Sequence, residues 1–142
     1  MKKKSLLFSF TSYDVIDEND RILKKRKFNL DAEYNKLSKS NFIGLSTVII
    51  NKKLISKIVF PNLKTQEDFG LWLKLIRSGI KLTHINKKLS FWRKTNDSLS
   101  SNIFDTFRDS FKLFYFYEKK NLINSFFSLL VLSYNKIIKE LN

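Results

Sequence analysis

Hydrophobic and polar residues alternate near the start of the chain. The stretch from Ser5 to Ile16 is rich in Phe, Tyr, Val and Thr, and the acidic run at residues 17–20 interrupts it before apolar residues return. A period of two is typical of a strand with one buried face, and Asp and Asn favour turns. The pattern therefore predicts two strands joined by a turn in which Asp17 and Asp20 hydrogen-bond the backbone.

Two more elements follow this expected hairpin. Residues 31–40 place Tyr34 and Leu37 on one face behind an aspartate that can cap, which favours a short helix. Residues 45–50 are β-branched and almost wholly apolar, as expected for a strand buried on both faces.

The clearest helical periodicity lies in the middle of the chain. Apolar residues recur at helical spacing from Phe69 to Ile76, and Gly79 ends the run. Thr65 and the acidic pair Glu67-Asp68 are suited to the first turn, because side-chain oxygens and negative charge are both favoured at a helix N-terminus. We therefore expect a helix that Thr65 caps.

The C-terminal part of the chain predicts two strands and two helices. Residues 80–85 and 89–93 alternate as strands on either side of a turn, and residues 104–118 and 122–141 have broad aromatic helical faces. These faces fit packing on the preceding domain. The alternative is a peripheral membrane anchor, because lysines at 112, 119, 120, 136 and 139 could meet anionic lipid.

The composition is that of a folded, basic chain. Of the 142 residues, 43% are hydrophobic, and 27 Lys and Arg against 13 Asp and Glu give a net charge of +14. This apolar content excludes disorder throughout. With no cysteine and one histidine, His84, the sequence also excludes disulfides, thiolate metal sites and multi-histidine zinc sites.

The positive charge indicates a solvated surface more than a nucleic-acid site. Many lysines stand in pairs beside expected turns. No segment interleaves aromatic and basic residues or presents a recognition helix, so nucleic acid is not an expected partner. An anionic membrane surface fits the same charge at least as well.

No segment of the sequence predicts membrane insertion. The apolar run after the basic start at residues 2–4 is too short and interrupted for a signal peptide. The longest apolar stretch, residues 122–134, is shorter than the roughly 18 residues of a spanning helix. We therefore expect a cytoplasmic protein, with peripheral contact at the inner face of the cytoplasmic membrane as an addition.

Five short segments are individually weak but more specific together. They are Phe8–Tyr13 with Ile16-Asp17, Ile43–Ile50, Glu67–Leu73, Gly79, and Trp92-Arg93 with Ser98–Ser100. In this order and spacing they resemble the C-terminal half of family-2 nucleotide-sugar glycosyltransferases of the GT-A fold, over roughly residues 5 to 102. The resemblance implies an α/β fold, with the acceptor-side half of a GT-A mixed-sheet domain over residues 1–103 and a helical segment over residues 104–142.

The resemblance also implies an activity and assigns residues to it. The activity is inverting transfer of a sugar from a nucleotide-diphosphate-sugar donor to a hydroxyl of a glycan or lipid-linked acceptor, as in bacterial surface polysaccharide synthesis. Asp68 would be the general base, because the attacking hydroxyl must lose its proton. Glu67, Trp72 and Trp92 would bind the acceptor, and Arg93 would bind diphosphate as a fork of donors.

Each of these residues also has a purely structural interpretation. Glu67 and Asp68 at a helix start are common capping and dipole residues. Trp72 and Trp92 are more often core or pocket wall than ligand platform, and Arg93 is more often a surface ion-pair residue. His84, in an alternating segment, is expected to be structural or exposed.

The family's donor-binding strands and Asp-x-Asp metal motif are absent from the sequence. Asp-x-Asp holds the divalent ion, Mg²⁺ or Mn²⁺, that neutralises the departing diphosphate. We therefore expect no cofactor on this chain, a metal only together with an N-terminal half, and a truncated product that is inactive and poorly soluble alone. That half could be a separately encoded partner. The competing hypothesis is a non-catalytic basic module that binds an anionic partner or membrane surface.

Overall fold

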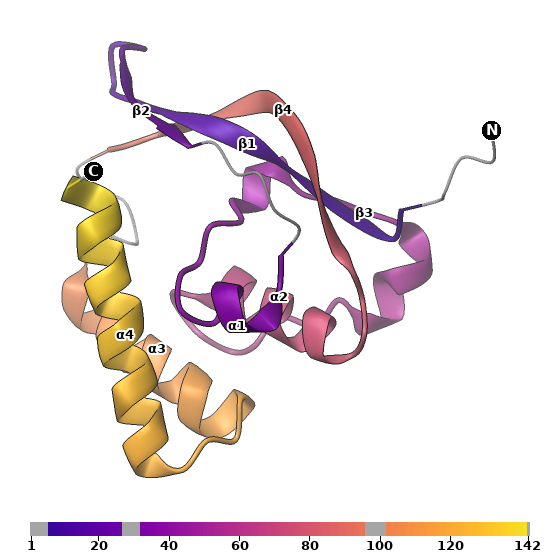
Figure 1. The fold of residues 1–142 in the computed structure, drawn as a ribbon, viewed down its shortest axis with the longest axis vertical. Helices are drawn as coiled ribbons and strands as arrows, with labels where there is room; N and C mark the ends of the chain where they lie inside the picture. The colour runs from indigo at the N-terminus through magenta and orange to yellow at the C-terminus, as the bar shows by residue number, and fades with distance from the viewer. Residues whose placement is uncertain (1–5, 27–31, 96–101, 142) are drawn as a thin grey trace.

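The chain forms a mixed β-sheet built around one central strand. The computed structural model describes residues 6–26, 32–95 and 102–141. Strand β1 (Phe8–Ile16) pairs antiparallel with β2 (Ile22–Arg26) at one end and with β3 (Ile49–Ile50) at the other, and parallel with β4 (Leu82–Arg93) along its whole length. Figure 1 shows this twisted sheet on one side of the molecule. The mixed sheet and the α/β class agree with the sequence-based expectation.

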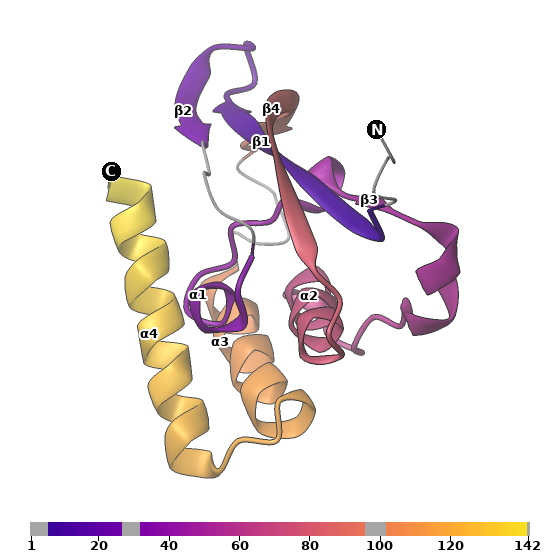
Figure 2. The same ribbon diagram turned by 45° about the vertical axis from the view of Figure 1, so that its right-hand side comes forward.

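Helices cover one face of the sheet and extend beyond it. They are α1 (Tyr34–Leu37), the 3₁₀ turns Leu45–Thr47 and Lys52–Lys57, α2 (Glu67–Arg77), α3 (Ile103–Lys112), which continues into the π-helical segment Leu113–Tyr117, and α4 (Leu122–Leu141). In both Figure 1 and Figure 2, α1 lies between α4 and α2, and α4 forms one flank of the molecule.

The predicted hairpin and the predicted central helix are confirmed. Asp17 Oδ1 accepts hydrogen bonds from the backbone N–H groups of Asn19 (2.9 Å) and Arg21 (2.8 Å). Asp20 has a φ of 65°, a left-handed conformation that Asp tolerates in turns. The acidic run therefore forms the turn between β1 and β2.

Two strand predictions are wrong. Residues 45–47 form a 3₁₀ turn, and only the two residues of β3 remain a strand, with the side chain of Ile49 68% exposed. Residues 82–85 and 89–93 belong to the single strand β4, because pairing with β1 continues through two register shifts that absorb the predicted turn. Tertiary pairing thus overrides the local turn signal.

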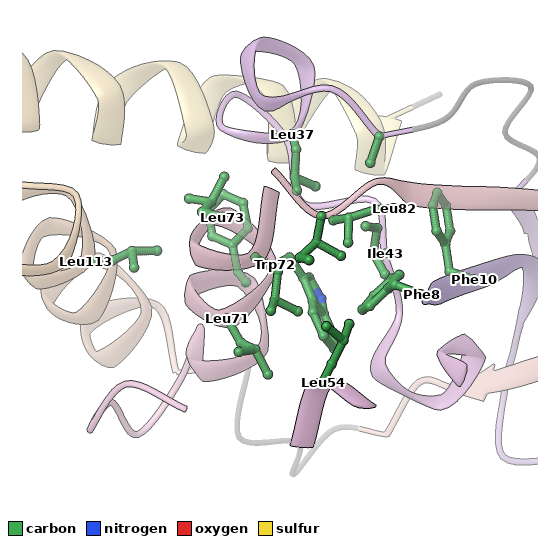
Figure 3. Packing of buried hydrophobic residues seen from close by; sticks show 14 of the residues in the cluster. Phe8, Phe10, Leu37, Ile43, Leu54, Leu71, Trp72, Leu73, Leu82 and Leu113 are labelled. Carbon is green, nitrogen blue, oxygen red and sulfur yellow. The ribbon is translucent and has the colours of Figure 1, made fainter. Parts of the chain in front are cut away.

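The core lies between the sheet and α2. Phe8 of β1 packs against Trp72 of α2, and Phe10, Leu37, Leu73 and Leu82 belong to the same cluster of buried side chains (Figure 3). The rings of Phe8 and Trp72 are 5.1 Å apart and pack edge to face, an arrangement that aromatic rings favour. Because α2 is buried on most of its circumference, it is held in a fixed position against β1.

Gly70 allows α2 to pack closely on its neighbours. A Cβ atom at this position would lie 2.7 Å from Cγ of Pro61 and 2.9 Å from Cδ1 of Leu113. We expect Gly70→Ala to lower the free energy of unfolding by about 1–3 kcal/mol, since overpacking forces side chains or backbone to move. Chemical denaturation measures this. Lys74→Ala on the exposed side of the same helix is the control and should change stability by less than about 0.5 kcal/mol.

The helical segment after β4 is attached to the domain through buried carboxylates. The carboxylate of Glu118 accepts a hydrogen bond from the hydroxyl of Tyr34 in α1 and lies 3.5 Å from the guanidinium of Arg77 in α2. Asp105 and Asp109 of α3 contact the residues that precede α2. Packing on the preceding domain, one of the two interpretations of these helices, is thereby confirmed for their inner face.

Candidate functional site

A pocket of about 690 Å³ opens at the N-terminus of α2. Its walls come from β1, the segment 40–46, the residues that precede and begin α2, the end of β4, and the inner side of α4. The lining includes Tyr13, Arg26, Ser40, Asn41, Ile43, Gly44, Leu45, Ser46, Lys64, Thr65, Gln66, Glu67, Asp68, Trp92, Leu132, Lys136 and Lys139. Segments from the whole length of the chain thus converge on the Glu-Asp pair.

The acidic pair stands at a sharp turn of the backbone. Gln66, immediately before α2, has a φ of 65°, a left-handed conformation that is uncommon for a residue other than glycine, Asn or Asp. This turn leads directly into Glu67 and Asp68, the first two residues of α2, and both line the pocket. Such conformations persist where surrounding contacts impose them, and they are common at functional sites.

Thr65 does not cap the helix as the sequence predicts. Its hydroxyl lies 3.3 Å from Oδ2 of Asp109, and its backbone N–H donates to the same oxygen at 2.8 Å. The backbone N–H of Lys64 donates to this oxygen as well, at 2.9 Å. The carboxylate of Asp109, which is 1% exposed, therefore fixes the backbone that leads into Gln66 and the acidic pair. No local sequence pattern predicts this contact, because Asp109 is 44 residues from Thr65 and 45 residues from Lys64.

Hydrogen bonds stabilise the ionised form of Asp109. Although burial alone would raise its pKa, hydrogen bonds from the N–H of Thr65 and from the side chain of Arg108 lower the pKa below its ordinary value. Asp109 is therefore an anion that accepts from four donors, the N–H groups of Lys64 and Thr65, the hydroxyl of Thr65 and Nε of Arg108. An ionised acceptor makes stronger bonds to backbone N–H groups than a neutral one.

The environment of Asp68 has the opposite effect. Burial raises the pKa of Asp68 from its ordinary 3.8 to about 6, and the neighbouring charge of Glu67 also raises it. The N–H of Phe69 donates to Oδ1 at 2.6 Å and partly offsets this rise. The result is a carboxylate at a pocket wall that can accept a proton near neutral pH, the property that a general base requires.

The structure separates the two predicted acceptor-binding tryptophans. Trp92, near the end of β4, lines the pocket with its side chain 39% exposed. Trp72 is fully buried in the core and absent from the pocket lining (Figure 3). The prediction of acceptor contact for Trp72 is therefore wrong. Its position one turn after Asp68 points it toward β1, because the apolar face of α2 must cover Phe8.

Arg93 also lies outside the pocket lining. Its guanidinium donates to the carbonyl of Asp17 at 2.8 Å and to the carboxylate of Asp20 at 2.6 Å. Arg93 thus joins the end of β4 to the turn between β1 and β2, and the structure does not support its assignment to diphosphate. The ion-pair interpretation is confirmed. His84 is structural as expected, with Nε2 3.1 Å from the hydroxyl of Ser12.

Four basic residues line the pocket instead. The sequence pattern assigned none of them to this site, and it offered Lys136 and Lys139 only as contacts for anionic lipid. The four residues are Arg26 of β2, Lys64 before α2, and Lys136 and Lys139 of α4. Lysines throughout this basic chain indicate a solvated surface, so these four carried no distinguishing signal. Only the three-residue spacing of Lys136 and Lys139, which places both on one helical side, hints at a shared role. Against Glu67 and Asp68, the lining has an excess of positive charge.

The described residues do not fit the metal that the resemblance implies. The sequence holds no Asp-x-Asp motif. In the three described stretches, no three His, Cys, Asp or Glu side chains come together as a group that could hold a metal ion. The segment Ser98–Ser100 lies outside the described residues. Glu67 and Asp68 are the two carboxylates in the pocket lining.

Within the described ranges, no helix combines the length and the apolar character needed to span a bilayer. α4 is long enough at 20 residues, but polar and charged side chains interrupt it.

Comparison with known proteins identifies relatives of one kind. The chain is 32% identical over 103 residues to TuaG of Bacillus subtilis, named as a glycosyltransferase of teichuronic acid biosynthesis. It is 31% identical over 105 residues to WfgD of Escherichia coli, named UDP-Glc:alpha-D-GlcNAc-diphosphoundecaprenol beta-1,3-glucosyltransferase. An uncharacterized glycosyltransferase of Haemophilus influenzae is 26% identical over 142 residues. The resemblance to glycosyltransferases stated from the sequence is confirmed.

These matches cover most of the chain and a smaller part of each relative. The shares are 72% of this chain and 41% of TuaG, 73% and 41% for WfgD, and 98% and 56% for the Haemophilus protein. No protein-family model matches the chain. A stretch that covers 72% of the chain must include Asp68, because a shorter part than that lies on either side of it.

Proposed function

Starting from its homology to bacterial glycosyltransferases, we propose that this chain forms the acceptor side of a GT-A type glycosyltransferase site. The observation that carries the proposal is Asp68, a carboxylate with a pKa raised to about 6, on the wall of a pocket of about 690 Å³. GT-A glycosyltransferases transfer a sugar from a nucleotide-diphosphate-sugar to an acceptor hydroxyl, and the relatives that carry descriptive names belong to polysaccharide or lipid-linked sugar synthesis.

Asp68 acts as the general base in this proposal. The acceptor oxygen attacks the anomeric carbon from the face opposite the leaving group, a new C–O bond forms, and the bond to the nucleotide diphosphate breaks. Asp68 accepts the proton that the hydroxyl loses. A positioned base of this kind contributes about 10²- to 10⁴-fold to the rate.

The remaining lining residues bind and orient the acceptor. The ring of Trp92 offers an apolar face to a sugar, and Glu67 accepts hydrogen bonds from its hydroxyl groups. The excess of basic side chains suits an acceptor that carries phosphate, such as the diphosphoundecaprenol-linked sugar in the name of WfgD. A lipid-linked acceptor in turn requires peripheral contact with the inner face of the cytoplasmic membrane.

A hybrid enzyme tests the proposed function. In it, this chain replaces the segment of WfgD that it matches, and glucose transfer from UDP-Glc to GlcNAc-diphosphoundecaprenol is measured. We expect transfer well above that of a WfgD variant with the segment deleted. A correctly folded hybrid without transfer would contradict the proposal and favour a non-catalytic basic module.

The pH dependence of transfer follows from the pKa of Asp68. The base is active when ionised. The value of kcat/KM for the hybrid should therefore rise with pH, reach half of its maximum near pH 6, and level off at higher pH. A profile measured with a lipid-linked acceptor at saturating UDP-Glc checks this. If kcat/KM does not change across this range, Asp68 does not exchange a proton in the rate-limiting step.

A further inference from the structure

The helical hairpin formed by α3, the π-helical segment and α4 carries a row of exposed apolar side chains on its outer face. On α4, Ile123, Phe127, Leu130, Tyr134 and Ile137 follow one another at helical spacing, and each side chain is between 46% and 77% exposed. The opposite face holds Ser125, Leu129 and Leu132, which are 0%, 5% and 8% exposed. α4 is therefore apolar on both sides, whereas a surface helix of a globular protein normally has a polar outer face.

The other arm of the hairpin also exposes apolar side chains. Ile103 and Phe104 at the start of α3 are 71% and 77% exposed, and Phe116 in the π-helical segment is 63% exposed. Monomeric soluble proteins rarely expose apolar patches of more than a few hundred Å², and larger ones mark interaction surfaces. We define the outer face as the exposed apolar side chains of residues 103–137.

Charge on the hairpin is sorted between its two sides. Over the described residues 102–139, the acidic residues Asp105, Asp109 and Glu118 are 6%, 1% and 7% exposed, and each forms an ion pair or a hydrogen bond inside the protein. The exposed charged side chains over the described residues 102–139 are all basic: Arg108, Lys112, Lys119 and Lys136. The exposed charge on this part of the chain is therefore positive, although Arg108 also pairs with Asp105 and Asp109 and Lys136 also lines the pocket.

This combination selects one occupant. Aromatic and aliphatic side chains on one side, with Lys and Arg around them, are the signature of helices that lie in the interface of an anionic bilayer. Each basic residue near such a surface contributes about 1 kcal/mol. A second copy of the same face would bring lysines against lysines, which disfavours self-association. We propose that the outer face of the α3–α4 hairpin binds an anionic phospholipid surface.

The proposal also accounts for the position of the pocket. Leu132 and Lys136 of α4 line the pocket, while Phe127 and Tyr134 of the same helix belong to the outer face. A helix with its side chains is about 10–12 Å across, so the pocket wall would stand about one helix diameter above the lipid. Delivery of a lipid-linked acceptor across this distance rests on the proposed function, whereas lipid binding itself does not.

Vesicle co-sedimentation tests the proposal with matched variants. The full chain is mixed with vesicles of phosphatidylglycerol and phosphatidylcholine in equal parts, or of phosphatidylcholine alone. We expect the chain to bind the anionic vesicles, to bind neutral vesicles at least about tenfold more weakly, and to dissociate in high salt. The double variant Ile123→Ser/Phe127→Ser should bind anionic vesicles at least about tenfold more weakly, because it removes two apolar side chains that would be buried in the lipid.

The control carries the same two substitutions elsewhere. Ile55→Ser/Phe60→Ser changes side chains that are 74% and 45% exposed, around the turn Lys52–Lys57 on the opposite side of the molecule from α4 (Figure 1). It should bind anionic vesicles like the unaltered chain. Thermal unfolding followed by circular dichroism verifies that both double variants fold.

Three results would overturn the proposal. They are no binding of the unaltered chain to anionic vesicles, equal loss in both double variants, and an Ile123/Phe127 variant that binds normally. If light scattering shows that this variant instead dissociates a dimer while vesicle binding persists, the outer face joins two copies of the chain. Since no readout uses sugar transfer, a failure of the proposed function would leave these outcomes unchanged.

Discussion

Asp68→Asn should reduce glucose transfer by the WfgD hybrid by about 10²- to 10⁴-fold, which is the contribution of a positioned general base. The amide retains an oxygen that can accept from the N–H of Phe69, so the first turn of α2 keeps its contact. It cannot take a proton from the acceptor hydroxyl. Steady-state measurements with UDP-Glc and the lipid-linked acceptor should show the loss in kcat.

Asp20→Asn is the matched control for this substitution. Asp20 is 76% exposed in its side chain and pairs with Arg93, an exposed ion pair worth at most about 1 kcal/mol. Asn also tolerates the left-handed backbone at this position. Transfer should therefore be unchanged. Equal activity of the Asp68→Asn and Asp20→Asn hybrids would remove Asp68 from the mechanism.

Asp68→Asn should also make the fold more stable at neutral pH. The folded state raises the pKa of Asp68 from 3.8 to about 6, so it favours the protonated carboxyl. The contribution of Asp68 to the free energy of unfolding therefore falls as pH rises between these values. Asn carries no charge and lacks this penalty. Thermal unfolding at neutral pH should show a higher midpoint for Asp68→Asn, as expected where function costs stability.

Asp109→Ala should lower the free energy of unfolding by about 3–5 kcal/mol, because it breaks a buried network of charge-assisted hydrogen bonds. It removes the acceptor for the N–H groups of Lys64 and Thr65 and leaves the buried Thr65 N–H without its hydrogen bond. It also removes the partner of Arg108 Nε. Urea denaturation of the chain measures the change.

Two companion variants separate this network from loss of charge alone. Asp109→Asn keeps one carbonyl oxygen for the backbone donors, so it should recover part of the loss. The side chain of Glu33 is 65% exposed and forms an ion pair with Lys36. Glu33→Ala deletes this exposed pair and should cost less than about 1 kcal/mol. If Asp109→Ala costs no more than Glu33→Ala, the carboxylate does not anchor the turn before α2.

The sequence by itself determined the elements whose signals are local. Alternation over Ser5–Ile16 and the acidic turn after it predicted the β1–β2 hairpin, because Asp17 bonds its own backbone neighbours. Helical spacing from Phe69 to Ile76 predicted α2, since one face of a helix must be apolar to be buried. Asp68 was singled out by its place in a family pattern, and it does line the pocket.

The tertiary structure decided everything that depends on distant partners. Trp72 lies in the core and Trp92 lies in the pocket wall, although both belong to the same family pattern. For Trp72, only the packing of α2 on β1 determines which side of the helix faces inward. Asp109 came to hold Thr65 from 44 residues away. A local pattern records the period of burial in one segment, whereas the partner of a side chain depends on how segments far apart in the chain are brought together.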